Sequence, residues 1–200
     1  MKLAARLMEH TQAYRFWQAP FAEKKFAPVL AHNDLGSVKR VLDVGCGPGT
    51  NTHHFHDAGY LGIDRNESYI DYARRRYKRD FLVADITQYS APAGEQYDFI
   101  LLNSFLHHID LPNTLRILSH LCRLLTNDGH VHIIELVLSG RRSIARFLAC
   151  WDRGAFPRPL QEWQEVLGET FEPVVFEPFE VTGLGAKLWD MVYFKGRARG

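Results

Sequence analysis

The chain has 200 residues, of which 46% are hydrophobic and 12% aromatic, enough to bury one domain core but short for two. Its 24 lysine and arginine residues nearly balance 23 aspartate and glutamate residues. The chain therefore lacks the excess positive charge that favours binding to nucleic acid or to an anionic membrane surface. Cys46, Cys122 and Cys150 form no CxxC pattern, and no apolar run approaches the ~20 residues of a membrane span. We therefore expect a cytoplasmic protein with no nucleic-acid partner and no membrane insertion; the oligomeric state stays open.

Short apolar runs alternate with longer amphipathic stretches, a pattern typical of strand–helix units around a parallel sheet. The pattern predicts strands at residues 39–45, 59–64, 80–85, 97–105 and 129–138, with helices at residues 50–58, 66–78 and 112–125.

The carboxyl end departs from this alternation. Residues 171–181 and 186–196 are both predicted strands, and the four residues TGLG between them are too few for a helix but suit an antiparallel hairpin. Pro173 and Pro178 cannot donate hydrogen bonds to a sheet, so the first of these strands is expected at the sheet edge and the last strand inside.

Residues 41–50 read VLDVGCGPGT, a buried-strand pattern followed by a glycine-rich turn that lets a ligand approach the backbone. Asp64 ends the second predicted strand, about 20 residues after Gly45, where a carboxylate can accept hydrogen bonds from ribose hydroxyls. The glycines read G-C-G-P-G rather than G-x-G-x-x-G, and the charge of Asp43 would oppose a pyrophosphate but favour an amine. The loop therefore indicates an amino-acid nucleoside rather than NAD.

Four segments in chain order, VLDVGCGPGT, LGID, LVAD and YDFILLNSFLHHI, resemble the successive motifs of class I S-adenosylmethionine-dependent methyltransferases. The resemblance covers residues 39–139 by motif and 171–195 by architecture, and it is greatest to the small-molecule branch that includes the ubiquinone and menaquinone methyltransferases. It implies an α/β, Rossmann-like, doubly wound seven-stranded sheet in the order 3-2-1-4-5-7-6, mostly parallel with an antiparallel final strand. It also implies a single domain over residues 1–200 that methylates a small-molecule substrate.

The resemblance further implies how S-adenosylmethionine is held. Asp43 and the glycine loop would hold the aminocarboxypropyl group, Asp64 the ribose, and Asp85 and Ile86 the adenine. Asn103 is followed by Ser-Phe-Leu rather than Pro-Pro-Tyr, which disfavours methylation of adenine or of a glutamine amide. The expected cofactor-binding residues are Asp43, Gly45, Cys46, Gly47, Gly49, Asp64, Arg65, Asp85, Ile86, Asn103 and Ser104. Among them, the small Cys46 between glycines is interpreted mainly as a packing residue rather than a nucleophile.

Three residues are candidates for catalysis: His107, His108 and Glu135. His107 and His108 follow the fourth strand and Glu135 falls late in the fifth, and these strand ends are neighbours in such a sheet. A hydroxyl acceptor has to lose its proton to a base, and a well-placed histidine contributes ~10²- to 10⁴-fold. We therefore predict a His107–Glu135 dyad for O-methylation. The alternative is that the histidines cap a helix or touch the cofactor while Glu135 binds backbone.

No metal site is expected from the spacing of potential ligands. His53, His54 and His56 are close together, and His130 and His132 share a strand face, but chain spacing completes no tetrahedral set with a carboxylate or thiolate.

Two segments outside the strand–helix core are candidates for choosing the acceptor. Residues 1–38 are predicted to be an amino-terminal helical cap and residues 141–168 a helical insertion that acts as a lid. Both alternate aromatic residues with arginines, which suits a flat or acyl acceptor carrying an acid; the substrate-binding candidates are Tyr14, Trp17, Trp151 and Arg153. The alternative is that these rings pack helices onto the sheet.

The leading hypothesis is an enzyme that methylates a small molecule, at oxygen in the first instance, with nitrogen and carbon left open. A noncatalytic S-adenosylmethionine-binding partner subunit is the first alternative, because intact binding motifs do not prove chemistry. An NAD-linked oxidoreductase is the second, and the glycine spacing, Asp43 and the closing hairpin all disfavour it.

Overall fold

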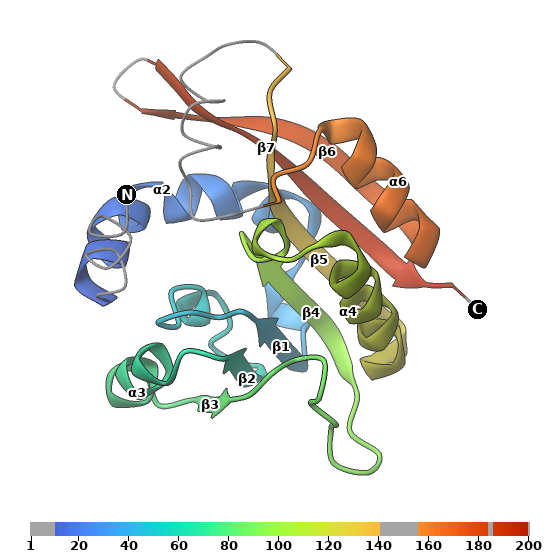
Figure 1. Ribbon diagram of the computed structural model, residues 1–200. Coiled ribbons are helices and arrows are strands. Elements are labelled where there is room, and N and C mark those ends of the chain that lie inside the picture. The colour runs from blue at the N-terminus through green and yellow to red at the C-terminus, as the bar shows by residue number, and fades with distance from the viewer. Residues whose placement is uncertain (1–10, 141–155, 184–185, 200) are drawn as a thin grey trace.

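The seven strands of the computed structural model form one sheet, shown in Figure 1; the structure describes residues 11–140, 156–183 and 186–199, with side chains described from residue 21 onward. The strand order is β3-β2-β1-β4-β5-β7-β6, as predicted. The strands are β1 (Arg40–Val44), β2 (Gly59–Asp64), β3 (Asp80–Val83), β4 (Tyr97–Asn103), β5 (Leu125–Val137), β6 (Phe171–Gly183) and β7 (Ala186–Ala198).

Strands β1 to β5 pair in parallel, whereas β7 runs antiparallel to both β5 and β6. The expected hairpin is therefore confirmed. Strand β6, which carries Pro173 and Pro178, lies at the sheet edge. Strand β7 lies inside, where each of its two edges is hydrogen-bonded to a partner strand. The parallel order places the carboxyl ends of β1, β2 and β4 side by side, next to the loops that follow them.

Helices cover both faces of the sheet (Figure 1). α4 (Leu111–Leu124) and α6 (Leu160–Thr170) pack on one face, where Leu118 and Trp163 are fully buried. α2 (Thr11–His32) and α3 (Glu67–Arg76) pack on the other, where Phe26 and Ile70 are buried. Because side chains alternate along a strand, successive residues of β1 serve the two cores in turn.

The helix predicted for residues 50–58 is wrong: this segment contains only the short 3-10 helix η2 (Thr52–His54). The His53 ring bonds the Thr50 carbonyl, and the Asn51 side chain is bonded to Asp43 and Asn103. Such side-chain bonds compete with helical backbone bonds, and Asn, Thr and His are weak helix formers. The described residues contain two other 3-10 helices, η1 (Leu35–Ser37) and η3 (Leu106–His108).

Membrane-spanning helices are not found in the described part of the chain, where every helix is too short or too polar to cross a bilayer. In α2, its longest helix, Arg15 and the consecutive Glu23, Lys24 and Lys25 interrupt the apolar residues.

Candidate cofactor and active site

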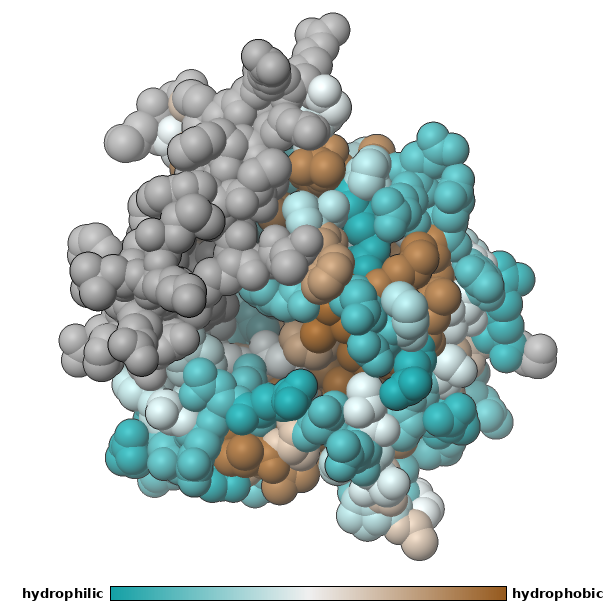
Figure 2. All heavy atoms as spheres, in the orientation of Figure 1, coloured by the Kyte–Doolittle hydropathy of each residue, from teal (hydrophilic) through white to brown (hydrophobic). Residues whose placement is uncertain are grey.

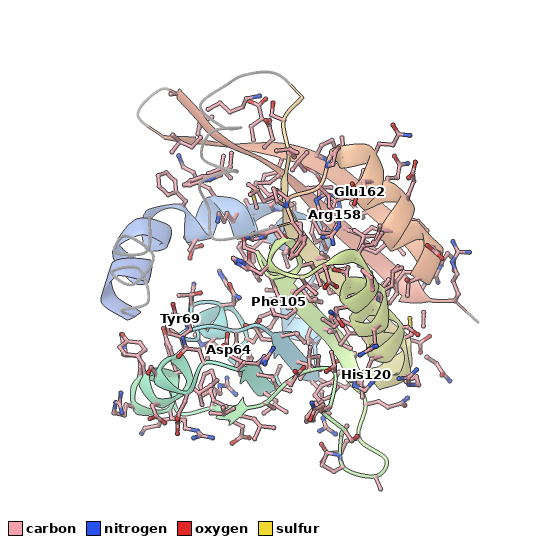
Figure 3. All side chains as sticks on the ribbon, viewed as in Figure 1. Asp64, Tyr69, Phe105, His120, Arg158 and Glu162 are labelled. Carbon is pink, nitrogen blue, oxygen red and sulfur yellow. The ribbon has the colours of Figure 1, made fainter. Side chains whose placement is uncertain are left out.

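A cavity of about 330 Å³ opens at the carboxyl ends of β1, β2 and β3. Residues that line it include Gly45, Asp64, Arg65, Asp85, Ile86 and Phe105. Figure 3 shows Asp64 at the end of β2 and Phe105 just beyond β4. Figure 2 shows hydrophobic residues gathered at the centre of the same face of the molecule, over the region of β4 and α4. The cavity thus combines an apolar wall with carboxylates on the opposite side.

The glycine-rich loop adopts a backbone that other residues avoid, with φ of 69° at Gly45, 54° at Gly47 and 78° at Gly49. Gly45 also has no room for a side chain, because a Cβ atom there would lie 2.4 Å from Cδ2 of Phe105. Of this loop, Gly45 lines the cavity, directly after Val44 at the end of β1.

The loop is tied to the end of β2. The backbone N–H groups of Gly45 and Cys46 both donate to the Ile63 carbonyl, at 2.8 and 3.1 Å, and the Gly47 N–H donates to Asp64 Oδ2 at 2.9 Å. Asp64 Oδ1 accepts a second bond from the Asn66 N–H at 2.8 Å. Burial raises the pKa of Asp64 against these bonds. The same carboxylate thus shapes the loop and lines the cavity.

Asp43 lies fully buried beneath the loop. Its Oδ2 accepts hydrogen bonds from the Tyr60 hydroxyl at 2.7 Å and from Asn51 Nδ2 at 3.2 Å, while its Oδ1 has no hydrogen-bond partner among the described residues. Asn103 Nδ2 donates to Asn51 Oδ1 at 3.1 Å, which extends the network to β4. Burial raises the pKa of Asp43 to about 6. A buried carboxylate with an unused oxygen fits a cationic group such as the ammonium of S-adenosylmethionine.

Asp85 stands on the far side of the cavity and is held in one orientation. Its Oδ1 accepts from the Thr87 N–H at 2.9 Å and from Thr87 Oγ1 at 2.8 Å, and these bonds lower its pKa. Arg65 Nη1 lies 3.7 Å from Asp85 Oδ2, and Ile86 is buried. The ionised carboxylate, the adjoining backbone and the apolar Ile86 together suit an adenine ring with exocyclic amino donors.

Cys46 is buried, and its surroundings are those of a packing residue. A Cβ atom added at Gly62 would lie 2.9 Å from its Sγ atom, so the thiol fills the space that Gly62 leaves. Burial, and then the charges of Asp43 and Asp64, raise the pKa of the Cys46 thiol well above its ordinary value. A neutral, enclosed thiol is a poor nucleophile.

His107 and Glu135 are brought into direct contact by η3 and β5. His107 Nδ1 lies 2.7 Å from Glu135 Oε2, and Glu135 Oε1 accepts from the N–H groups of Phe105 at 2.8 Å and Leu106 at 2.5 Å. Burial acts to raise the pKa of Glu135, but the charge and hydrogen bond of His107 and the two amides outweigh it, so this pKa is lowered. Ser104, directly before this segment, has a φ of 57°, a strained value for a residue other than glycine.

The two neighbouring histidines differ in exposure. His107 is 1% exposed and His108 is exposed, and their rings lie 4.1 Å apart between centroids. The backbone N–H of Phe156 donates to the His107 carbonyl at 3.0 Å, so the segment before α6 lies directly against η3.

Arg158 fastens this segment and was not singled out as a site residue by the sequence. It is 3% exposed, and its guanidinium donates to the carbonyls of Leu106 at 3.2 Å and Ile109 at 2.8 Å. Its Nε lies 3.2 Å from Glu162 Oε1, and Figure 3 shows the two side chains together beside α6. No spacing rule connects an arginine to carbonyls about fifty residues earlier in the chain.

Sequence reasoning also missed Asn51, Tyr60 and Phe105, which complete the Asp43 network and the wall of the loop. Asn51 and Phe105 could have been found as site residues because each lies in or next to a quoted motif. The sequence offered no such signal for Tyr60. The substrate-binding candidates Trp151 and Arg153 lie outside the described residues, as do the side chains of Tyr14 and Trp17.

Comparison with known proteins concerns the domain and the fold. Residues 41–129 match a family described as a methyltransferase domain. A trans-aconitate 2-methyltransferase from Paracidovorax citrulli is 33% identical over 86 residues, which are 40% of this chain and 33% of the relative. A ubiquinone biosynthesis O-methyltransferase from Bordetella avium is 30% identical over 121 residues, covering 52% of this chain and 49% of the relative. The matches thus span half or less of these curated relatives.

Solved structures share the fold over nearly the whole chain. The mitomycin 7-O-methyltransferase MmcR superposes with a TM-score of 0.72 at 16% identity, covering 94% of this chain and 56% of that one. The N-methyltransferase NodS from Bradyrhizobium japonicum gives 0.67 at 19% identity, covering 90% and 98%. The plantazolicin methyltransferase BpumL, solved in complex with SAH, gives 0.69 at 18% identity, covering 94% and 89%.

The fold is that of the Rossmann-like methyltransferases, with the sheet order and antiparallel last strand predicted from the sequence. The match to a methyltransferase domain over residues 41–129 agrees with the class I S-adenosylmethionine-dependent methyltransferases that the motifs of this chain resemble.

Proposed function

We propose that this protein transfers the methyl group of S-adenosylmethionine to a hydroxyl of a small-molecule acceptor, with His107 as the base. The observation that carries the proposal is the 2.7 Å contact between His107 Nδ1 and Glu135 Oε2 at the carboxyl ends of β4 and β5. O-methyltransferases among its relatives and structural neighbours support the choice of oxygen, although NodS is named an N-methyltransferase.

In this proposal the residues at the cavity hold the cofactor. Asp43 accepts from its ammonium, the glycine loop approaches the aminocarboxypropyl chain, Asp64 accepts from the ribose hydroxyls, and Asp85 with Ile86 contacts the adenine. Gly47, Gly49, Arg65, Asn103 and Ser104 contribute backbone or polar groups around them. When bound, S-adenosylmethionine supplies a methyl group attached to a sulfonium sulfur. Loss of this methyl group leaves a neutral thioether.

Glu135 orients the His107 ring and stabilises the positive charge that the ring acquires. Its carboxylate accepts a hydrogen bond from the Nδ1–H group of His107. The lone pair of the ring is then on Nε2, the nitrogen that takes the proton of the acceptor hydroxyl. The imidazolium that forms is stabilised by the ionised Glu135, whose pKa is lowered in this pocket. Two backbone amides hold the carboxylate in place, so little reorganisation accompanies the proton transfer.

Access to His107 is the main demand on this mechanism, since the side chain is buried. The backbone of Phe156 contacts the His107 carbonyl, so the proposed lid, residues 141–168, adjoins the base where its residues are described. We include this lid and the helical cap, residues 1–38, in the proposal as the parts that contact the acceptor, through Tyr14, Trp17, Trp151 and Arg153. Closure over a bound acceptor would exclude water from the base.

The experiment is transfer of labelled methyl from S-adenosylmethionine to a panel of phenol, alcohol, carboxylate and amine acceptors. His107→Ala should lower turnover at least ~10-fold, and Glu135→Gln should lower it as well, while S-adenosylmethionine affinity by calorimetry changes less than twofold. His130→Ala, a histidine near the amino end of β5, is the matched control and should retain turnover.

The outcomes separate the competing functions. Cofactor binding with no transfer to any acceptor would favour a noncatalytic binding subunit. Transfer that His107→Ala leaves intact at every pH would remove the histidine base but keep the methyltransferase. Binding of NAD in place of S-adenosylmethionine would overturn the proposal as a whole.

A further inference from the structure

We propose that Glu23, His53 and His54 bind a divalent transition-metal ion, Zn²⁺ in the first instance, which ties α2 to the segment that follows the glycine-rich loop. The proposal is independent of the catalytic base and of the acceptor.

The geometry of the three side chains is that of a nearly formed metal site. His53 Nε2 lies 2.9 Å from Glu23 Oε1, and His54 Nε2 lies 3.8 Å from the same oxygen. One ligand atom from each residue lies within 4.8 Å of the others, and within the part of the chain that the structure describes no second such group of three or more occurs. Ligand atoms about 2.0–2.2 Å from a tetrahedral Zn²⁺ lie about 3.3–3.6 Å apart, so an ion could enter after His53 and Glu23 separate slightly and His54 moves slightly closer to Glu23.

The orientation of His53 leaves the correct nitrogen for a metal. Its Nδ1 lies 2.9 Å from the Thr50 carbonyl, which can only accept, so Nδ1 carries a proton. Its Nε2 therefore faces the Glu23 carboxylate either through a second proton or through a shared cation. A histidine whose other ring nitrogen donates to a backbone carbonyl is the usual arrangement at protein metal sites.

His54 is held rigidly beside this pair. Its ring stacks on Phe26 with centroids 3.9 Å apart and planes 2° from parallel, and its side chain is 10% exposed. Glu23 and Phe26 are three residues apart on α2 and so share one face of that helix. The helix thus presents a carboxylate and an aromatic ring together to the two histidines.

The donor set selects the metal. Two imidazoles and one carboxylate are borderline ligands that suit Zn²⁺ rather than Mg²⁺ or Ca²⁺, which prefer oxygen ligands alone. The partial exposure of Glu23 and His53, whose side chains are 66% and 47% exposed, leaves a fourth position for water. A bound ion would hold α2 against η2, which follows the glycine-rich loop whose Gly45 lines the cavity.

Metal binding to the chelator-treated protein tests the proposal, with Zn²⁺ followed by calorimetry and Co²⁺ by its visible absorption. We expect one equivalent of Zn²⁺ to bind, a tetrahedral Co²⁺ spectrum, and a rise in the thermal midpoint on addition of Zn²⁺. Glu23→Gln and His53→Ala, both at partly exposed positions, should each weaken binding at least ~10-fold. They should also abolish the rise in thermal midpoint.

The matched control is His32→Ala. His32 Nε2 lies 2.6 Å from Glu177 Oε2, an exposed pair of the same kind that belongs to no described group of three ligands. This variant should bind Zn²⁺ as the unaltered protein does. Absence of binding, or binding that the Glu23 and His53 variants leave unchanged, would overturn the proposal and leave the methyl-transfer proposal unaffected.

Discussion

Phe105 occupies the position at which any residue other than glycine at position 45 would carry its Cβ atom, 2.4 Å from Cδ2 of the ring. The Phe105 ring thus packs directly against the backbone of Gly45, and both residues line the proposed cofactor cavity. Gly47 provides a natural comparison, because it shares a positive φ of 54° but has nothing within 4 Å of its added Cβ.

Gly45→Ala should therefore lower the free energy of unfolding by about 2–4 kcal/mol, since the backbone strain of a positive φ adds to the displacement of Phe105. Gly47→Ala should cost only the strain, about 1–2 kcal/mol. Denaturant unfolding of both variants measures the difference. Equal losses would show that Phe105 yields to the new methyl group without cost.

Asp43→Asn should stabilise the fold and weaken cofactor binding. Burial raises the pKa of Asp43 from 3.8 to about 6, so the ionised form at pH 7 costs the folded state on the order of 3 kcal/mol, relieved as pH falls through 6 towards 4. The variant should gain up to that amount at pH 7 and little near pH 4. Its affinity for S-adenosylmethionine should fall at least ~10-fold with loss of the charge pair.

Unfolding at the two pH values and calorimetry would check both parts. Asp80→Asn, at an exposed position at the start of β3, is the control and should change neither quantity. A variant that binds the cofactor normally would mean that Asp43 is structural alone.

Arg158→Met should destabilise the protein by about 3 kcal/mol, because it removes a charged, buried donor from the carbonyls of Leu106 and Ile109, which among the described residues keep only the Ile109 N–H and the Thr114 hydroxyl as donors. Glu162→Gln alters the 42%-exposed partner of the same arginine and should cost less than about 1 kcal/mol. Chemical denaturation of the two variants would compare them, and similar losses would show that the ion pair rather than the carbonyl contacts matters.

Buried His132 should make the fold sensitive to mild acid. Its Nδ1 lies 2.9 Å from the Tyr193 hydroxyl and its ring stacks on Phe99 at 3.7 Å, and burial lowers its pKa well below 6.5. Below pH 6.5 the unfolded chain takes up a proton that the folded state refuses, so stability falls by up to about 1.4 kcal/mol per pH unit from this group.

His132→Gln should remove about one proton from that pH dependence, measured as the slope of unfolding free energy between pH 6.5 and 5. His54 and His130, whose pKa values burial also lowers, still contribute in the variant. His108→Gln, at an exposed position, should keep the full slope. A slope unchanged by His132→Gln would mean that the ring accepts a proton inside the fold.

Local patterns were enough to predict the strand–helix units, the hairpin and the edge position of β6, whereas the full strand order followed from the resemblance to the methyltransferases. Alternation, proline placement and a four-residue turn depend only on residues that are close together in the chain. A parallel sheet then leaves few ways to connect the resulting elements. The helix predicted at residues 50–58 failed because Asn51 bonds to Asp43 and Asn103, and a contact between strands and loops outweighs local propensity.

The sequence by itself indicated the class of the protein, because the glycine loop and the acids at the strand ends form motifs of neighbouring residues. It also predicted that His107 and Glu135 would be neighbours, since His107 follows the fourth strand and Glu135 lies late in the adjacent fifth strand. Only the tertiary structure decided that Phe105 covers Gly45, that Arg158 binds the carbonyls of η3, and that Glu23 meets His53 and His54. These contacts join segments far apart in the chain, and their geometry depends on how helices dock on the finished sheet.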